Sequence, residues 1–155
     1  MKSRVLVIVL IFSLQFFACR QEMKFFREAE LLHYLHQNDT LTGQMPDILL
    51  LLVGSGCGNC VDATKNILSD LNSLTDTKIE VIIGSAEAYI EYNTHMGPKM
   101  KIIHTSRDTL LSRGLSFSSD MIFVIGESGT IDEFWGITYE SESAVRKYLN
   151  SKKDK

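Results

Sequence analysis

The chain has 155 residues, of which 45% are hydrophobic and 23% charged, as in a globular protein rather than a disordered or collagen-like one. This length suits one domain with its own core. The formal net charge is −3 and no long basic run is present, so we expect no nucleic-acid partner. Three cysteines are too few for a disulfide-stapled mini-protein, so their positions matter more than their number.

The N-terminal residues predict export from the cytoplasm. Lys2 and Arg4 are followed by a mainly apolar run over residues 5–18. A bilayer-spanning helix needs about twenty apolar residues, so this shorter run fits the hydrophobic region of a secretory signal. We therefore expect residues 1–18 to be a signal peptide and the mature protein to lie outside the cytoplasmic membrane.

Cys19 directly follows this run and the small residue Ala18. This junction resembles the lipobox of bacterial lipoproteins, although Phe16 and Phe17 depart from its usual residues. The resemblance implies lipidation of Cys19 and anchoring to a bacterial membrane, on the periplasmic side or at the cell surface. The alternative is an ordinary signal peptide or an uncleaved anchor, with an incidental Cys19.

Helices and strands are predicted to alternate along the mature chain. A tether and helix occupy residues 19–43, and one domain occupies residues 44–155. Helices are expected over 22–37, 58–74, 86–92 (capped by Ser85), within 107–115 and from Ser141; strands are expected over 47–53, 78–83, 100–104, 121–125 and 130–136. This order predicts an α/β sandwich with a mixed central β-sheet and helices on both faces.

Cys57 and Cys60 lie where a buried strand passes into an amphipathic helix. At a helix start, unpaired backbone N–H groups and the helix dipole favour negative charge, so Cys57 is expected to be a reactive thiolate. Cys60 lies one turn further on and can attack a mixed disulfide formed on Cys57. The pair therefore predicts thiol–disulfide exchange.

The strand, CxxC and helix of residues 48–74, followed by the strand–turn–strand of residues 122–131, resemble the thioredoxin superfamily. Together with the export signal, they look most like its membrane-tethered, extracytoplasmic thiol–disulfide oxidoreductases. The resemblance implies a thioredoxin-like three-layer sandwich with Cys57 and Cys60 as catalytic residues. It also implies partners that are thiol or disulfide proteins, and it implies no organic cofactor and no metal.

The sequence departs from the family at three places. Gly56 stands where an aromatic residue usually precedes the first cysteine, and Leu51 stands near the buried acid of thioredoxin. Asp120 or Met121 takes the place of the cis-proline before the fourth strand, so we expect a trans loop of different shape.

By the same resemblance, Ser55, Gly56, Asp120 and Met121 are expected to form a substrate-docking loop. A carboxylate at Asp120 close to Cys57 would raise the pKa of that thiol by like-charge repulsion.

A metal site is the alternative for the cysteine pair. His95, Met96 and His104 follow the second predicted strand, and a cysteine pair with histidine or methionine suits copper. The rival hypothesis is therefore a metal-binding or non-catalytic binding module built on the same fold.

Overall fold

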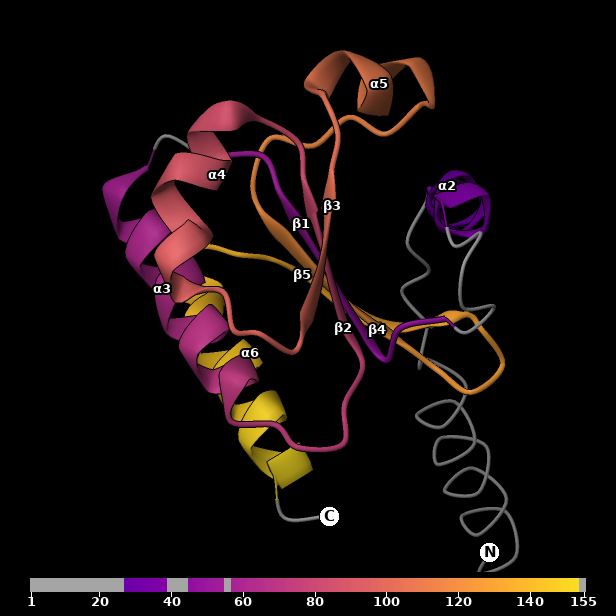
Figure 1. The fold of residues 1–155 in the computed structure, drawn as a ribbon. Coiled ribbons are helices and arrows are strands. Elements are labelled where there is room, and N and C mark those ends of the chain that lie inside the picture. The colour runs from indigo at the N-terminus through magenta and orange to yellow at the C-terminus, as the bar shows by residue number, and fades with distance from the viewer. Residues whose placement is uncertain (1–26, 39–44, 55–56, 154–155) are drawn as a thin grey trace, which may run out of the picture.

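The computed structural model describes residues 27–38, 45–54 and 57–153 (Figure 1). The predicted signal segment, Cys19, Ser55 and Gly56 lie outside these residues. Among the described helices, none combines the length and apolar character needed to cross a bilayer.

The described part of the chain alternates between helices and strands, as predicted. Its elements are α2 (Glu28–Asn38), β1 (Ile48–Leu52), α3 (Gly58–Asn72), β2 (Ile79–Ile83), α4 (Ala86–Tyr92), the 3-10 turn η1 (Asn93–His95), β3 (Met100–His104), α5 (Arg107–Ser112), β4 (Met121–Ile125), β5 (Ile131–Gly136) and α6 (Tyr139–Lys153). The strand order is β3-β2-β1-β4-β5. Strands β1, β2 and β3 are parallel, whereas β4 is antiparallel to both β1 and β5, which confirms the mixed sheet.

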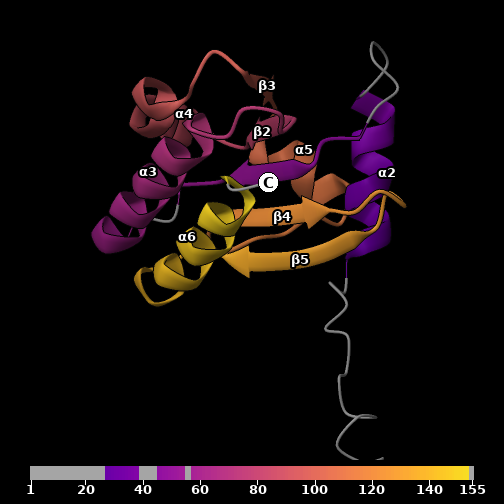
Figure 2. The same ribbon diagram turned by 90° about the horizontal axis from the view of Figure 1, so that it is seen from below.

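Strand β1 shows why the sheet needs helices on both faces. All five of its residues are buried. Ile48, Leu50 and Leu52 pack into the core shared with α3, α4 and α6, whereas Leu49 and Leu51 pack into the core on the side of α2 and α5. Figure 2 shows the two helical layers on opposite sides of the strands. The predicted three-layer α/β sandwich is therefore confirmed.

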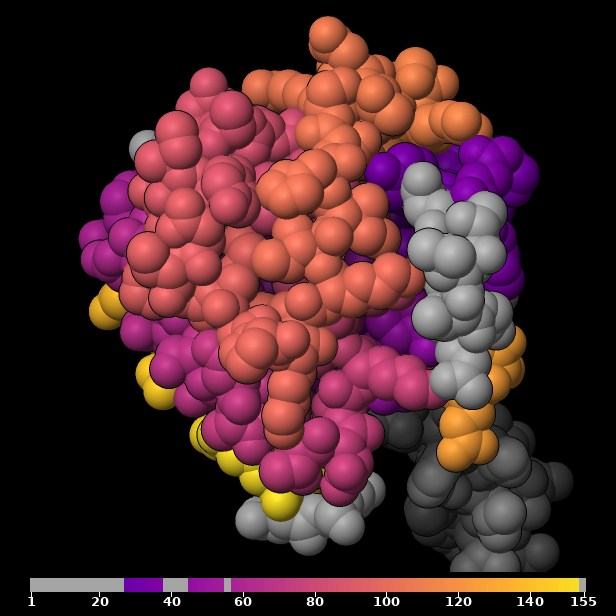
Figure 3. Space-filling model, viewed as in Figure 1, coloured from indigo at the N-terminus to yellow at the C-terminus, as the bar shows by residue number. Residues whose placement is uncertain are grey.

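Strand β3 forms one edge of this sheet. Lys101, Ile102 and His104 are exposed along it. In Figure 3 the residues around β3 and α5 lie open at the surface between α4 and α2.

Two helix starts near the end of β1 are fixed by side-chain caps. Ser85 caps α4, as predicted, and its hydroxyl accepts a hydrogen bond from the Ala88 amide at 3.0 Å. Helix α6 begins at Tyr139, two residues before the predicted start at Ser141. The Thr138 amide donates to Ser141 Oγ at 2.9 Å, and the Ser141 amide donates to Thr138 Oγ1 at 3.2 Å. This reciprocal capping makes Thr138 the cap and puts Tyr139 in the first turn.

Candidate active site

Cys57 is the N-cap residue of α3, with extended backbone angles of φ −96° and ψ 114°. Its carbonyl oxygen accepts hydrogen bonds from the amides of Cys60 and Val61, each at 2.9 Å. The chain leaves β1 through Gly54, whose φ of +77° favours glycine. The Cys57 side chain is exposed, so a partner can reach its sulfur. The predicted position of Cys57 at the start of the helix is confirmed.

The two thiols of the pair differ in acidity. The pKa of Cys57 lies below its ordinary value, chiefly because of the neighbouring Cys60 side chain and further because of the backbone amides of Cys60 and Asn59. The pKa of Cys60 lies above its ordinary value because of the same contact with Cys57, burial, and the negative charges of Cys57 and Asp120. The anion therefore resides on Cys57, and Cys60 holds the proton that stabilises it.

Helix α6 also begins beside the pair. The backbone of Tyr139 hydrogen-bonds to the Cys60 sulfur, which partly offsets the raised pKa of that thiol. Tyr139 is 69% exposed, although it follows the buried Ile137 by only two residues. The sequence prediction placed this residue before the helix and missed its contact with the site.

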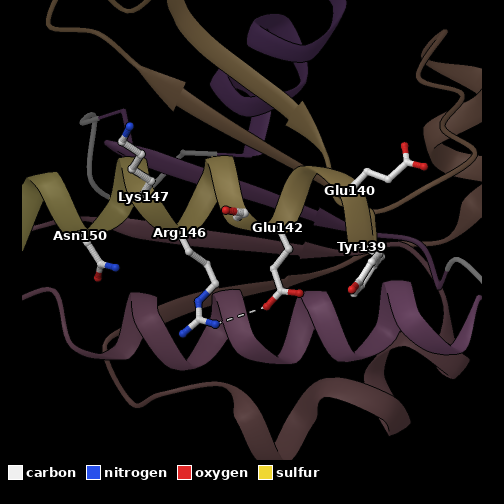
Figure 4. A pocket seen from close by; sticks show the side chains of 7 residues that line it. Tyr139, Glu140, Glu142, Arg146, Lys147 and Asn150 are labelled. Atoms are coloured by element: carbon white, nitrogen blue, oxygen red, sulfur yellow. Dashed lines mark hydrogen bonds and ion pairs between the residues drawn. The ribbon is translucent and has the colours of Figure 1, made fainter.

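Figure 4 shows Tyr139 at the start of α6, above α3, at one end of an open pocket that runs along α6. An ion pair from Arg146 to Glu142 lies in this pocket, and Arg146 also donates to Asp70 of α3 at 2.7 Å. Asn66 of α3 donates to Glu142 at 2.8 Å. These contacts stabilise the packing of α6 against α3, so the first turns of these two helices stay side by side.

Asp120 does not lie where the sequence led us to expect. Its side chain is fully buried, so it cannot line an exposed docking loop. Its charge raises the pKa of Cys60 and is not among the causes that shift the pKa of Cys57. The correction follows from topology: Asp120 precedes β4, which pairs with β1, and the carboxylate turns inward beneath the end of β1. The described backbone holds no cis peptide, as expected for the loop at Asp120.

Met121, the other described residue of the predicted docking loop, is half-buried and packs into the core on the α2 side. It pairs with Leu51 in β1 and with Gly136 in β5. Its side chain thus contributes to the core on the face opposite α3.

Tyr92 and Thr64 complete a polar network that the sequence did not reveal. The buried Tyr92 hydroxyl donates to Asp120 Oδ2 at 2.6 Å. Burial, and then the contact with Asp120, raises the pKa of Tyr92 far above its ordinary value, so the phenol stays protonated. The Thr64 hydroxyl lies 3.1 Å from both the Cys60 carbonyl oxygen and Asp120 Oδ2.

The residues of the alternative metal hypothesis do not form a cluster with the cysteine pair. His95 lies in η1, and its carbonyl accepts from Asn72. The His104 ring meets the Tyr89 ring edge-on, with centroids 5.1 Å apart. Within residues 27–38, 45–54 and 57–153, no group of three or more histidine, cysteine, aspartate or glutamate residues could hold a metal ion.

No protein-family model matches the chain. No curated protein matches it either. Among solved structures, the chain is similar to a thioredoxin-like protein from Bacteroides caccae, with 15% identity and a TM-score of 0.45 over 70% of this chain and 41% of that one. It is also similar to a candidate protein disulfide isomerase from Bacteroides thetaiotaomicron, with 13% identity and a TM-score of 0.47 over 70% of this chain and 75% of that one. The chain thus spans less than half of the length of the first of these proteins.

Proposed function

We propose that the protein is a thiol–disulfide oxidoreductase that exchanges disulfides with partner proteins through Cys57 and Cys60. The observation that carries this proposal is the asymmetry of the pair: an exposed Cys57 with a lowered pKa at the N-cap of α3, beside a Cys60 with a raised pKa. Such a pair has a nucleophile that ionises more readily than a free thiol and a second thiol that keeps its proton until it attacks the mixed disulfide.

The reaction proceeds in two steps. The Cys57 thiolate attacks one sulfur of a partner disulfide, which forms a mixed disulfide and releases the other partner sulfur as a thiolate. Cys60 then loses its proton to solvent and attacks the Cys57 sulfur, which forms the Cys57–Cys60 disulfide and releases the second partner thiolate. Two electrons pass from the pair to the partner disulfide. Run backwards, the same steps oxidise a partner dithiol.

Open space beside the pair supports a protein as the substrate. A Cβ atom built on Gly58 meets no heavy atom within 4 Å, and Asn59 between the cysteines is exposed. A polypeptide carrying a disulfide can therefore approach the Cys57 sulfur without moving the α3 backbone.

The test is reduction of insulin by dithiothreitol, catalysed by the detergent-solubilised full chain. We expect the wild type to accelerate precipitation of the insulin B chain, and Cys57→Ser to reduce the rate to that of dithiothreitol alone. Cys60→Ser should retain the first attack and accumulate a mixed disulfide, visible on a non-reducing gel. A wild-type protein that gives no acceleration, and no mixed disulfide in Cys60→Ser, would contradict the proposal.

We further propose that this exchange takes place outside the cytoplasm, on a protein held to a bacterial membrane by a lipid on Cys19. The support is the sequence of residues 1–19 alone. Mass spectrometry of the membrane fraction should find a diacylated Cys19 as the first residue. An intact Met1 would show an uncleaved anchor instead.

A further inference from the structure

Exposed hydrophobic side chains gather along the edge strand β3. Five large hydrophobic side chains are exposed in the part of the chain that the structure describes, and four of them lie on β3 or on the helices before and after it. Ile102 lies on β3, Tyr89 and Ile90 on α4, and Leu111 on α5; Ile90 has 75% of its surface exposed. Figure 3 looks onto this edge. Such a group at the edge of a sheet indicates an interface.

The backbone of β3 presents hydrogen-bonding groups to a further strand. In the described sheet, β3 is the last strand on its side and pairs with β2 alone. The Thr105 amide donates to the Ile83 carbonyl at 2.9 Å, so residues at odd positions along β3 turn their backbone groups toward β2. Ile102 and His104 alternate with them, so their amides and carbonyls point beyond the sheet.

The opposite edge of the sheet, β5, is less suited to pairing. The Ile131 amide of β5 donates to Glu28 Oε1 of α2 at 2.9 Å. Asp132 and Glu133 then place two exposed acids in succession along the strand. Charged side chains on an edge strand oppose pairing with another chain. Of the two edges, β3 is therefore the one that can accept a strand.

We propose that β3 is a homodimer interface, in which two copies of the chain pair their β3 strands antiparallel about a two-fold axis at Ile102. The pairing joins two five-stranded sheets into one. Because β3 runs parallel to β1, which leads to the cysteines, the two cysteine pairs lie at opposite ends of the joined sheet. This inference goes beyond the proposed function and does not depend on it.

The register of β3 is self-complementary about this axis. Ile102 exchanges backbone hydrogen bonds with Ile102 of the second copy, and the His104 amide donates to the Met100 carbonyl of the second copy. The Met100 amide already donates to the Gly97 carbonyl at 3.1 Å, so it takes no part. Met100 belongs to the core on the α4 side, and Ile102 and His104 face the same side. The two Ile102 side chains therefore pack against each other.

The lysine of β3 does not oppose this pairing. Lys101 Nζ lies 2.6 Å from Glu80 Oε1 of the neighbouring strand, so its charge is paired within each copy. The register sets Lys101 opposite Ile103 of the second copy, and not opposite a second lysine. Like charges therefore do not meet across the strand pair.

Charges at the ends of β3 favour a second copy as the partner. The exposed Lys99 precedes β3 and comes opposite Thr105 of the second copy. Thr105 follows His104, whose ring contacts the ring of Tyr89 in the first turn of α4. The exposed Glu87 lies in the same turn. An ammonium group of one copy thus approaches a carboxylate of the other at both ends of the pair, as a symmetric contact requires.

The test is disulfide cross-linking of the full chain in detergent, in a background of Cys19→Ser, Cys57→Ser and Cys60→Ser. On oxidation with copper phenanthroline, Ile102→Cys should form a covalent dimer on a non-reducing gel, because hydrogen-bonded residues of an antiparallel pair have Cα atoms about 5.5 Å apart. Lys101→Cys is the matched control in the same strand. Two copies of residue 101 lie on a diagonal of about 7–8 Å, beyond the usual reach of a disulfide.

We expect Ile102→Cys to cross-link at least about tenfold faster than Lys101→Cys, because the bound strands hold the first pair of thiols together at high effective concentration. Equal rates for the two variants would indicate random collision and would overturn the proposal. The absence of a covalent dimer in both variants, or cross-linking of Ile102→Cys to a different protein in the membrane fraction, would also overturn it.

Sedimentation equilibrium in density-matched detergent tests the same interface without cysteine chemistry. The Cys19→Ser chain should have the mass of a dimer. Ile102→Asp should have the mass of a monomer, because the two-fold axis sets two carboxylates directly opposite each other. Tyr139→Asp, an exposed hydrophobic position away from β3, is the control and should remain dimeric. A monomeric Cys19→Ser chain, or a dimer that persists in an Ile102→Asp protein with a native circular dichroism spectrum, would overturn the proposal.

Discussion

Asp120 is buried at the end of the sheet where β1 runs into the cysteine loop, whereas Asp47, Asp76 and Asp132 are exposed at the opposite end. There, with Glu127 of the β4–β5 hairpin, they line an open pocket of about 760 Å³. Water and salt screen these exposed carboxylates. Asp120 is shielded from both within a donor cage formed by the amides of Val53 and Gly54 and the hydroxyls of Thr64 and Tyr92. Acids at the two ends of the sheet therefore differ in their surroundings, which are hydrogen-bond donors of the protein at the cysteine end and water at the hairpin end.

The largest expected effect tests whether the cysteine end and the hairpin end of the sheet are stabilised by the same hydrophobic core. Leu50 is fully buried in the middle of β1. Leu50→Ala should lower the free energy of unfolding by about 2–5 kcal/mol, because it leaves a cavity between sheet and helices. Urea denaturation measures this change. A decrease in the free energy of unfolding of less than about 1 kcal/mol would show that the core relaxes to fill the cavity at residue 50.

Tyr92→Phe removes a hydrogen-bond donor from the buried Asp120 carboxylate at the cysteine end of the sheet. A hydrogen bond to a charged group contributes about 1.5–3 kcal/mol, so a loss of that size is expected at pH 7 in urea denaturation. Asp132→Asn, at the other end, serves as the control.

The same variant predicts a change in pH dependence. The pKa of Tyr92 is raised in the folded protein, so the phenol stabilises the fold fully below its unfolded pKa of about 10, and this contribution is lost as pH rises above that value. Above pH 10 the wild type should lose about 1.4 kcal/mol more per pH unit than Tyr92→Phe. Equal slopes for the two proteins would contradict the burial of Tyr92.

Thr138→Ala removes the cap that sets the start of α6 beside Cys60. Loss of a cap costs about 1 kcal/mol. The pH midpoint of Cys60 alkylation should also rise, because the Tyr139 backbone contact that lowers it becomes less ordered. A Thr138→Ala protein that is less stable but keeps its pH midpoint for Cys60 alkylation would show that the cap does not affect the acidity of Cys60.

The smallest effect is expected at the hairpin end. Asp132→Asn should change the free energy of unfolding by less than about 0.5 kcal/mol, because the side chain is exposed. The rates at which Cys57 and Cys60 are alkylated should stay unchanged. A shift in either rate would mean that charges at this end also reach the cysteine pair.

Local patterns in the sequence predicted most of the fold. The unbroken apolar run of β1 and the helical spacing of α3 arise from neighbouring residues, and they located both elements and the start of α3 at Cys57. The inward turn of Asp120 depends on the pairing of β4 with β1, and its contact with Tyr92 joins residues 28 positions apart. Contacts of this kind leave no local pattern, so the donor cage and the place of Tyr139 emerge only in three dimensions.

The most direct test of the account is the pH profile of alkylation at each cysteine, read residue by residue by mass spectrometry of the reduced full chain. We predict that Cys57 is alkylated with a midpoint below that of a free thiol and Cys60 with a midpoint above it. Equal midpoints, or a lower midpoint at Cys60, would contradict the assignment of Cys57 as the attacking thiolate.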